Sequence, residues 1–412
     1  MRTDHPRRAV VATATVVVVV VVVAAIVTGV VVTRGDDRTA APSPYPFARI
    51  GGDTPGSLVS AEPMPDFTRS LVGSSMRSAR VTYRSSSGDS DSPTVVSGAV
   101  FTPRTAAPAG GWPVIGFAHG TTGIDTACAP SLSPTLLQQV GAVDAFVRMG
   151  FAVAMPDYQG LGAPGVHAYL DARTAGLNTV DAVRALRATF PDISTRWAAY
   201  GGSQGGGATW AAATLASSRA PDLSLVGAVA IAPAGDVTGL VDKAVSGTLT
   251  SDQRPTFQAV VESLARLHPD VDRDDYRRGA AASGWDALTA CSGPLLDTRD
   301  AVVRSLRPGD LTPATPTAAD RVRTRLRAWA LPQGALAAPL YIEHGAQDTF
   351  IDAAWTRSAV ARQCAEGGSV TYRIDPDRGH GDVPTDAALR WLGERFTDVP
   401  ALNSCSSLVN SG

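Results

Sequence analysis

Short apolar runs alternate with segments of helical spacing along most of the chain. Runs with the length of sheet strands lie at 77–84, 94–102, 113–118, 151–155, 197–200, 225–232, 339–343 and 369–374. Helical patterns lie at 133–148, 174–190, 207–218, 353–364 and 386–396. This alternation predicts βαβ units and an α/β fold with a mostly parallel central sheet. The first two runs predict an antiparallel pair of strands.

The alternation stops between residues 233 and 338. This stretch contains helical patterns at 258–267 and 319–330 but no run with the character of a strand. We therefore predict a helical cap, or lid, at 233–338, inserted into a core formed by 67–232 and 339–403.

The two ends of the chain differ in composition from the core. Residues 1–33 start with arginines and continue in an apolar run from Ala9 to Val32, which is long enough to cross a bilayer of roughly 30 Å as a helix. Arginines before this run and acidic residues after it place the body of the chain outside the membrane. An uncleaved transmembrane anchor and a cleaved signal peptide both remain open, and either makes the protein extracellular. Residues 34–66 predict a linker and N-terminal arm, and 404–412 a C-terminal tail.

The composition narrows the classes of function. The 412 residues are 44% hydrophobic and 18% charged, which fits a globular protein with a sizeable core. The net charge is −2, and no run of Lys and Arg interleaved with aromatic residues occurs in the body of the chain. These features argue against nucleic-acid binding.

The four cysteines are Cys128, Cys291, Cys364 and Cys405, and none forms a CxxC pair. Their spacing therefore does not match the usual zinc or thioredoxin-type patterns. An even number of cysteines in an exported protein predicts two disulfides. Four cysteines allow three pairings, and buried free thiols are the alternative.

A candidate nucleophile lies in the segment Tyr200-Gly201-Gly202-Ser203-Gln204-Gly205. A Gly-x-Ser-x-Gly pattern alone arises by chance too often to identify a site, and an incidental serine in a glycine-rich turn is the simpler interpretation. Here, however, the pattern follows a strand-like run and precedes a helical one. That context is typical of a sharp turn that exposes a nucleophilic serine, so we predict Ser203 as the nucleophile.

A serine hydroxyl needs a base, and the order Ser, then Asp or Glu, then His is typical of this strand–turn–helix arrangement. His380 follows the last strand-like run and precedes the last helix, so it is the predicted base. The other histidines considered, His344, His268 and His167, fit structural or surface positions better.

The orienting acid should follow the penultimate strand, where Asp348 lies in Glu343-His344-Gly345-Ala346-Gln347-Asp348. Asp352 is the nearest rival, and it is expected to cap the helix that begins at Ala353. Asp375 and Asp377 lie too near His380 along the chain. We therefore predict Asp348 as the residue that holds the imidazole tautomer.

An oxyanion hole needs two hydrogen-bond donors near the nucleophile. One is predicted to be the backbone N–H of Gln204, which follows the serine. The other is predicted to be the backbone N–H of Thr121, in the loop after the strand at 113–118. Gly120 and Thr122 are the neighbouring alternatives.

These segments together resemble the secretory lipase family of α/β-hydrolases. The resemblance rests on His119-Gly120-Thr121-Thr122-Gly123, Cys128-Ala129-Pro130-Ser131, Pro156-Asp157-Tyr158-Gln159-Gly160-Leu161-Gly162 and Tyr200-Gly201-Gly202-Ser203-Gln204-Gly205-Gly206, followed by Asp348 and His380. It covers about residues 67–403. It implies the α/β-hydrolase fold, a helical cap over an acyl tunnel, no cofactor, no metal, and a Cys128–Cys291 disulfide. Cys364–Cys405 would then be the second pair.

The expected function is hydrolysis of carboxylic esters, in particular lipid esters as by a triacylglycerol lipase, through an acyl-enzyme on Ser203. We expect a monomer whose partner is a small or lipid ester, with membrane contact only through an uncleaved N-terminal segment. A serine peptidase or an acyltransferase could use the same residues. A non-catalytic cell-surface binding protein on a hydrolase scaffold is the alternative from another class.

Overall fold

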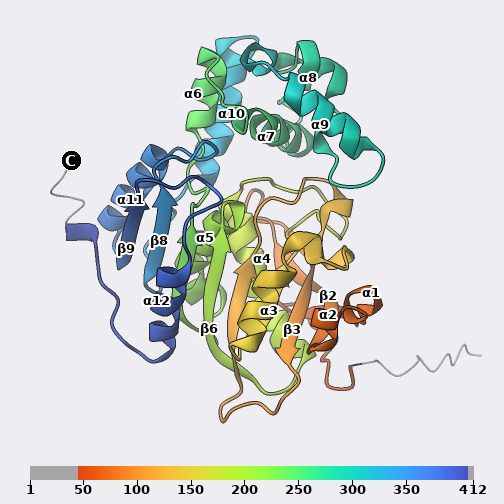
Figure 1. The fold of residues 1–412 in the computed structure, drawn as a ribbon, viewed down its shortest axis with the longest axis vertical. Helices are drawn as coiled ribbons and strands as arrows, with labels where there is room; N and C mark the ends of the chain where they lie inside the picture. Colours follow the sequence, from red (N-terminus) through yellow and green to blue (C-terminus); the bar gives the residue numbers. More distant parts are fainter. Residues whose placement is uncertain (1–44, 407–412) are drawn as a thin grey trace, which may run out of the picture. The chain divides into compact units, whose positions relative to one another are not determined.

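The computed structural model describes residues 45–406, so the predicted anchor or signal segment lies outside the described residues. Nine strands within this part of the chain form one sheet, in the order β1-β2-β3-β5-β4-β6-β7-β8-β9 (Figure 1). The strands are β1 (Leu58–Glu62), β2 (Met76–Ser86), β3 (Pro93–Pro103), β4 (Trp112–Ala118), β5 (Ala152–Pro156), β6 (Ile193–Gly202), β7 (Ser224–Ile231), β8 (Leu340–Gly345) and β9 (Val370–Asp375).

The sheet is parallel except at its N-terminal edge. β4 pairs in parallel with β5 and β6, and β7, β8 and β9 continue in the same direction. β1, β2 and β3 are antiparallel to one another, and β3 joins β5 in antiparallel register. The predicted mostly parallel sheet is therefore confirmed. The chain leaves β4 for β5 on one side and then returns to β6 on the other, so β4 and β6 flank a switch point, where α/β sheets bind ligands.

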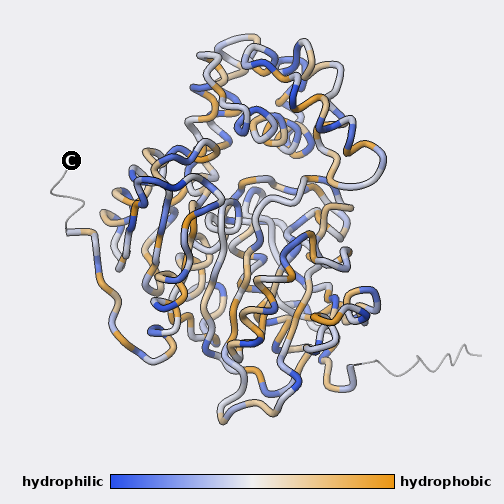
Figure 2. Tube along the Cα trace, viewed as in Figure 1, coloured by the Kyte–Doolittle hydropathy of each residue, from blue (hydrophilic) through white to orange (hydrophobic). Residues whose placement is uncertain are grey.

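Helices cover both faces of the sheet, and short helices precede β2. Those beside the sheet are α3 (Val140–Arg148), α4 (Ala172–Thr189), α5 (Gln204–Arg219), α11 (Ala353–Glu366) and α12 (Asp386–Phe396), and the short ones are α1 (Pro65–Thr68) and α2 (Leu71–Ser74). Figure 2 shows hydrophobic stretches along the central strands between these helices.

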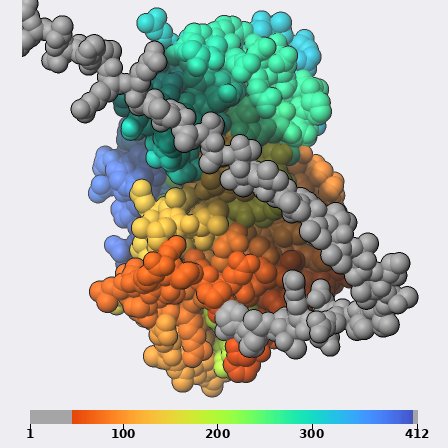
Figure 3. Space-filling view, turned by 90° about the vertical axis from the view of Figure 1, so that its right-hand side faces the viewer, coloured from red at the N-terminus to blue at the C-terminus, as the bar shows by residue number. Residues whose placement is uncertain are grey.

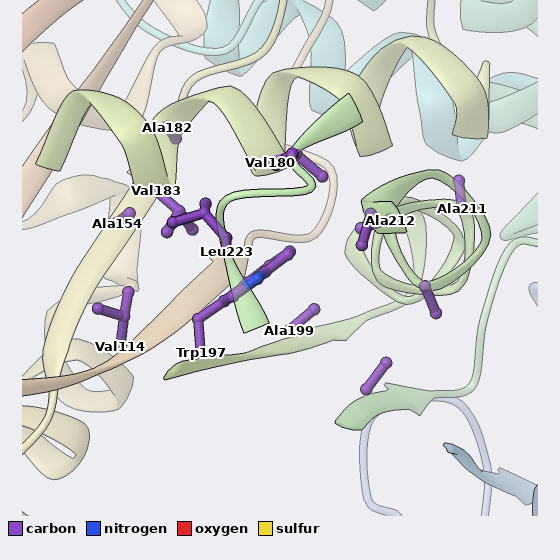
Figure 4. Packing of buried hydrophobic residues seen from close by; sticks show 14 of the residues in the cluster. Val114, Ala154, Val180, Ala182, Val183, Trp197, Ala199, Ala211, Ala212 and Leu223 are labelled. Atoms are coloured by element: carbon purple, nitrogen blue, oxygen red, sulfur yellow. The ribbon is translucent and has the colours of Figure 1, made fainter. Parts of the chain in front are cut away.

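Successive residues of the central strands pack on opposite faces, as the two-residue period of a strand requires. Val114 and Trp197 belong to the cluster under α4 and α5, which also contains Val183 (Figure 4). The next residues along, Ile115 and Ala198, belong to the cluster under α3 and α12. Burial on both faces explains why these strands read as continuous apolar runs in the sequence.

A helical segment joins β7 to β8. Its helices are α6 (Gly239–Ser246), α7 (Gln253–Leu267), α8 (Gly279–Gly284), α9 (Leu295–Ser305) and α10 (Pro316–Trp329). They enclose a hydrophobic cluster of their own, which includes Phe257, Val260 and Trp285. Figures 1 and 3 show these helices gathered beyond one end of the sheet. We refer to residues 239–329 as the cap helices, and the predicted domain boundaries stay a prediction.

A disulfide and several hydrogen bonds tie the cap helices to the loop after β4. Cys128 in that loop is disulfide-bonded to Cys291. The carboxylate of Asp125 accepts hydrogen bonds from Arg266 at 2.7 Å and from the hydroxyl of Thr289 at 2.9 Å. The cap helices are therefore held to the loop after β4, and both contribute to the pocket wall described below.

The structure differs from the sequence-based expectation in three places. Within the predicted linker, Leu58–Glu62 forms edge strand β1, whose five residues are too few to give a clear alternating pattern. The helix predicted at 133–148 begins only at Val140, because Leu136, Leu137 and Gln138 all have positive φ and break it. The cap contains α6, α8 and α9, which the sequence pattern did not indicate.

Candidate functional site

Ser203 occupies a strained position between β6 and α5. Its φ is 56° and its ψ is −122°, a conformation that residues with a side chain rarely adopt. Three backbone hydrogen bonds fix it: Ser203 N–H donates to the Ile231 carbonyl, and the Ser203 carbonyl accepts from Gly207 and Ala234. The neighbours thus hold a strained turn, as is common at functional sites.

Two of the surrounding glycines are required by close backbone contacts. A Cβ atom on Gly205 would collide with the Ala118 carbonyl, and a Cβ on Gly201 would collide with the carbonyls of Gly205 and Ala118. A Cβ on Gly202 would instead meet its nearest atom, the Ile231 carbonyl oxygen, at 3.6 Å. The loop after β4 and the serine turn are therefore packed backbone to backbone.

The structure brings Ser203, His380 and Asp348 into one hydrogen-bonded chain. Nε2 of His380 lies 2.9 Å from Ser203 Oγ, and Nδ1 lies 2.7 Å from Asp348 Oδ2. Because the carboxylate can only accept, the proton sits on Nδ1 and leaves a lone pair on Nε2 that faces the serine hydroxyl. The three residues come from the loops after β6, β8 and β9.

Asp348 is held as a carboxylate by several donors. Oδ1 accepts from the backbone N–H groups of Phe350 at 2.8 Å and Ile351 at 2.9 Å. Burial would raise the pKa of Asp348, but the hydrogen bonds from His344 and His380 outweigh it and hold this pKa well below its usual range.

His344 is a neighbour of Asp348 that the sequence analysis did not place at the candidate site. It was expected to be structural, and it is fully buried, but its Nε2 lies 3.0 Å from Asp348 Oδ2. The contact arises because the turn after β8 brings His344 close to Asp348, four residues later in the chain. The only signal in the sequence was the short His-Gly-x-x-Asp spacing.

The rival acid and histidines are engaged elsewhere. Asp352 precedes α11, as expected, but the prediction that its side chain caps this helix is wrong: its carboxylate instead accepts from Lys243 at 2.9 Å and Gln253 at 3.3 Å. His268 lies 3.3 Å from Asp89. Asp352 and His268 therefore have hydrogen-bond or ion-pair partners other than Ser203, His380 and Asp348.

His167 is a buried structural histidine beside the nucleophile turn. Its Nδ1 donates to the Gln159 carbonyl at 2.9 Å, and its Nε2 accepts from the Gln204 side chain at 3.0 Å. Burial lowers the pKa of His167 to about 4, so the ring is neutral at physiological pH. This hydrogen bond anchors the Gln204 side chain. The backbone N–H of Gln204 is at the first position of α5, where the N–H groups have no hydrogen-bond acceptor within the helix.

The loop after β4 is oriented by its own histidine. His119 is buried, and Nδ1 donates to the Gly120 carbonyl at 2.6 Å. Because C=O and N–H point in opposite directions across a trans peptide, the Thr121 N–H faces away from the His119 ring. The Thr121 hydroxyl lies 3.0 Å from the Tyr169 hydroxyl, and Thr121 lines the same cavity as Ser203.

Asp157 joins two of the segments that carry the family resemblance. Its buried carboxylate accepts from the Ser131 backbone at 2.8 Å and from the hydroxyls of Ser131 at 2.5 Å and Ser97 at 2.6 Å. Burial raises the pKa of Asp157, against the effect of these hydrogen bonds. The contact fixes the cysteine-bearing loop onto the end of β5, so these motif residues have a scaffolding role.

A cavity of about 530 Å³ opens at Ser203 and His380. Its wall is mostly apolar and comes from the loop after β4, from Phe350 and Ile351, and from the cap helices. Cys291 is part of this wall, and both Cys128–Cys291 and Cys364–Cys405 are disulfide-bonded. The first pair is the one that the family resemblance implied, and the second is the pair that then remained. Among the helices at 45–406, none combines the length and the apolar character needed to cross a bilayer.

Comparisons with known proteins find similarity to lipases. The model of the secretory lipase family matches residues 131–288. Lipase 6 of Candida albicans is 27% identical over 63% of this chain and 58% of its own length. A Mycobacterium tuberculosis protein named as a probable inactive lipase is 25% identical over 86% of this chain and 82% of its own length. The chain thus spans about three fifths of the length of several curated relatives that it matches.

The fold has a counterpart among solved structures. Lipase A of Candida antarctica in its closed state superposes with a TM-score of 0.66 at 19% identity, covering 88% of this chain and 89% of that one. The chain therefore has the α/β-hydrolase fold, and the resemblance to the secretory lipase family that its motifs predicted is confirmed.

Proposed function

We propose that the protein is a serine carboxylic-ester hydrolase with Ser203 as nucleophile, His380 as general base and Asp348 as the orienting acid. The observation that carries this proposal is the chain of hydrogen bonds from Asp348 through His380 to Ser203 Oγ, at 2.7 and 2.9 Å. These distances lie within the range over which a base can take the nucleophile's proton.

The first half-reaction forms an acyl-enzyme. Ser203 Oγ attacks the ester carbonyl carbon while its proton moves to His380 Nε2. The carbonyl π electrons move onto oxygen and give a tetrahedral oxyanion. When this intermediate collapses, the C–O bond to the alcohol breaks and His380 returns the proton to the departing alkoxide.

The second half-reaction releases the acid. Water attacks the acyl carbon and gives its proton to His380, and the collapsing intermediate expels Ser203 Oγ, which regains that proton. Throughout, Asp348 stays ionised and stabilises the imidazolium, a role that its lowered pKa suits.

We assign two backbone amides to the oxyanion hole. The Gln204 N–H belongs to the first turn of α5, where the helix dipole adds partial positive charge. The Thr121 N–H faces away from His119 and belongs to the loop that lines the cavity with Ser203. Losing one such donor typically costs about 10²–10³ in rate.

The apolar cavity and the disulfides support the finer parts of the proposal. A largely apolar wall suits an acyl chain, so lipid esters are the favoured substrates. The two disulfides and the similarity to secretory lipases favour a location outside the cell.

The test is labelling and hydrolysis by Ser203→Ala. The wild type should react with a fluorophosphonate probe and hydrolyse 4-nitrophenyl acyl esters, whereas Ser203→Ala should do neither while keeping its thermal unfolding temperature. Ser218→Ala, at an exposed position of α5, the helix that follows Ser203, is the matched control and should behave as wild type. Activity retained in folded Ser203→Ala would refute the assignment, and an unlabelled wild type would favour a non-catalytic binding protein.

A further inference from the structure

The cavity at Ser203 has one feature that an acyl pocket does not need. Among its lining residues, Arg299 is the only Asp, Glu, Lys or Arg. The remainder of the wall is made mainly of apolar side chains, with a few threonines and Tyr169. The Arg299 side chain is 35% exposed, so its guanidinium is only partly removed from water, and an anion bound in the cavity would meet this charge beside an apolar wall.

Arg299 is presented by the cap helix α9. Leu296, three residues earlier on this helix, also lines the cavity. Residues three apart share one face of a helix, so α9 turns an apolar and a cationic side chain toward the same space. On α9, Val302 packs against the cluster of the cap helices, which holds the helix in place.

The charge of Arg299 has no close acidic partner in the cavity. Its Nε donates to the Leu288 carbonyl at 3.3 Å, which orients the guanidinium. Its NH1 lies 3.4 Å from the carboxylate of the adjacent Asp300, a side chain that is 57% exposed. A solvent-exposed pair of this kind contributes little. Most of the five N–H donors of Arg299 therefore remain for a ligand.

The charge also acts on the interior of the pocket. Burial raises the pKa of the Tyr169 hydroxyl, hydrogen bonds with Thr121 and Thr256 oppose that rise, and the positive charge of Arg299 adds a smaller effect in the same direction. Tyr169 contacts the Thr121 hydroxyl of the loop beside Ser203. Arg299 is therefore close enough to act on this part of the cavity wall.

We propose that Arg299 binds an anionic group of the substrate, so that the preferred substrates are esters that carry a carboxylate or a phosphate at a distance from the scissile bond. This inference rests on the proposed ester hydrolase function. Arg recognises both groups through paired hydrogen bonds, and the apolar wall would hold the chain that separates the anion from the ester.

The kinetic test uses two esters that differ only in charge: 4-nitrophenyl hydrogen suberate, with a free carboxylate, and its methyl ester. The wild type should prefer the acid in kcat/KM. Arg299→Gln should lower the acid-to-neutral ratio by about tenfold or more, the scale of one lost hydrogen bond to a charged group, mainly through KM. Arg299→Lys should restore part of the ratio. Arg304→Gln, on the same helix but outside the cavity wall, should keep it.

Competition separates the two anions. Inhibition by octanoate and by octyl phosphate, each measured on wild type and Arg299→Gln, shows which group the arginine favours. Inhibition by at least one of them should weaken in Arg299→Gln. An acid-to-neutral ratio that is the same in wild type and Arg299→Gln would overturn the proposal.

A binding measurement keeps this result apart from failure of the proposed function. In a Ser203→Ala background, monomethyl suberate should bind more tightly than dimethyl suberate by calorimetry, and Arg299→Gln should abolish that difference. Equal binding of the two ligands would overturn the Arg299 assignment. If the wild type hydrolyses neither nitrophenyl ester, but Ser203→Ala still binds monomethyl suberate more tightly than dimethyl suberate, the result would support the role of Arg299 and refute only the hydrolase function.

Discussion

The Nε2 atom of His344 lies 3.0 Å from Oδ2 of Asp348, the same carboxylate oxygen that accepts from His380. His344 Nε2 also lies 3.0 Å from the Ile351 carbonyl. Because both neighbours are acceptors, this nitrogen carries a proton and donates. In the proposed mechanism, His344 is therefore a positioning residue, which would act on the reaction only through Asp348.

Replacing His344 should change the acid stability of the protein as well as the rate of catalysis. His344→Leu removes a donor that lowers the pKa of Asp348, so that pKa should rise. A carboxylate with a depressed pKa contributes stability that is lost as the pH falls through that pKa, so acid unfolding of His344→Leu should begin at higher pH than that of the wild type. We also expect kcat to fall by about tenfold or more, the scale of one hydrogen bond to a charged group.

The measurements are unfolding against pH, and kcat at neutral pH, for wild type, His344→Leu and His344→Gln, whose amide can still donate. His268→Leu is the control, because His268 contacts Asp89 instead of Asp348. An unchanged kcat together with an unchanged pH of acid unfolding in His344→Leu would show that the histidine only fills space.

The glycines around Ser203 should differ sharply in their tolerance of a methyl group. Gly205→Ala would drive a Cβ into the Ala118 carbonyl, so we expect a loss of about 3 kcal/mol or more, or failure to fold. Gly202→Ala places its Cβ no closer than 3.6 Å to its surroundings and should unfold within about 1 kcal/mol of wild type. Thermal unfolding checks both, and equal destabilisation would contradict the backbone-packing account of this turn.

Much of the site could be predicted from the sequence, because Ser203, Asp348 and His380 each follow a strand-like run. In a parallel sheet the carboxyl ends of the strands meet at one edge, so chain order alone brings these loops together. The bond from His344 to Asp348 depends on the geometry of one turn, which no periodic pattern encodes. Likewise, α9 has no fully buried residue, so its sequence lacks the apolar stripe that would have indicated it.

A buried carboxylate should make the cap helices sensitive to acid. Glu262 accepts from Arg266 at 2.7 Å, from Arg273 at 2.5 Å and from Trp285 at 2.8 Å. Burial would raise the pKa of Glu262, but these hydrogen bonds lower it to about 2. Relative to an ordinary Glu pKa of about 4.3, this contributes about 3 kcal/mol of stability, present above that value and lost as the pH falls towards 2.

Glu262→Gln should therefore destabilise the protein at pH 7, and the difference from wild type should shrink as the pH falls from about 4.3 towards 2. Denaturant unfolding at a series of pH values measures this. Asp270→Asn is the control, because Asp270 pairs with Arg325 at the surface and should contribute about 1 kcal/mol or less. A difference for Glu262→Gln that stays constant with pH would show that the carboxylate charge is not the cause.

The two disulfides should separate in their effect on activity. Cys128–Cys291 spans 163 residues and Cys364–Cys405 spans 41, so chain-entropy arguments give the first about 5 kcal/mol and the second about 4 kcal/mol of stability. Only the first touches the site: Cys291 lines the cavity, and the Cys128 carbonyl accepts from the Thr122 hydroxyl at 2.8 Å, beside the predicted oxyanion donor.

We expect Cys128→Ala/Cys291→Ala to lose activity at temperatures where it is still folded, because no covalent bond then joins the loop after β4 to the cap helices. Cys364→Ala/Cys405→Ala should unfold at a lower temperature than wild type but keep its kcat/KM while folded. Activity and thermal unfolding, measured on the same samples, distinguish the two. Equal kcat/KM for both folded variants would mean that the remaining hydrogen bonds, those to Asp125 among them, hold the cap helices over Ser203 without the disulfide.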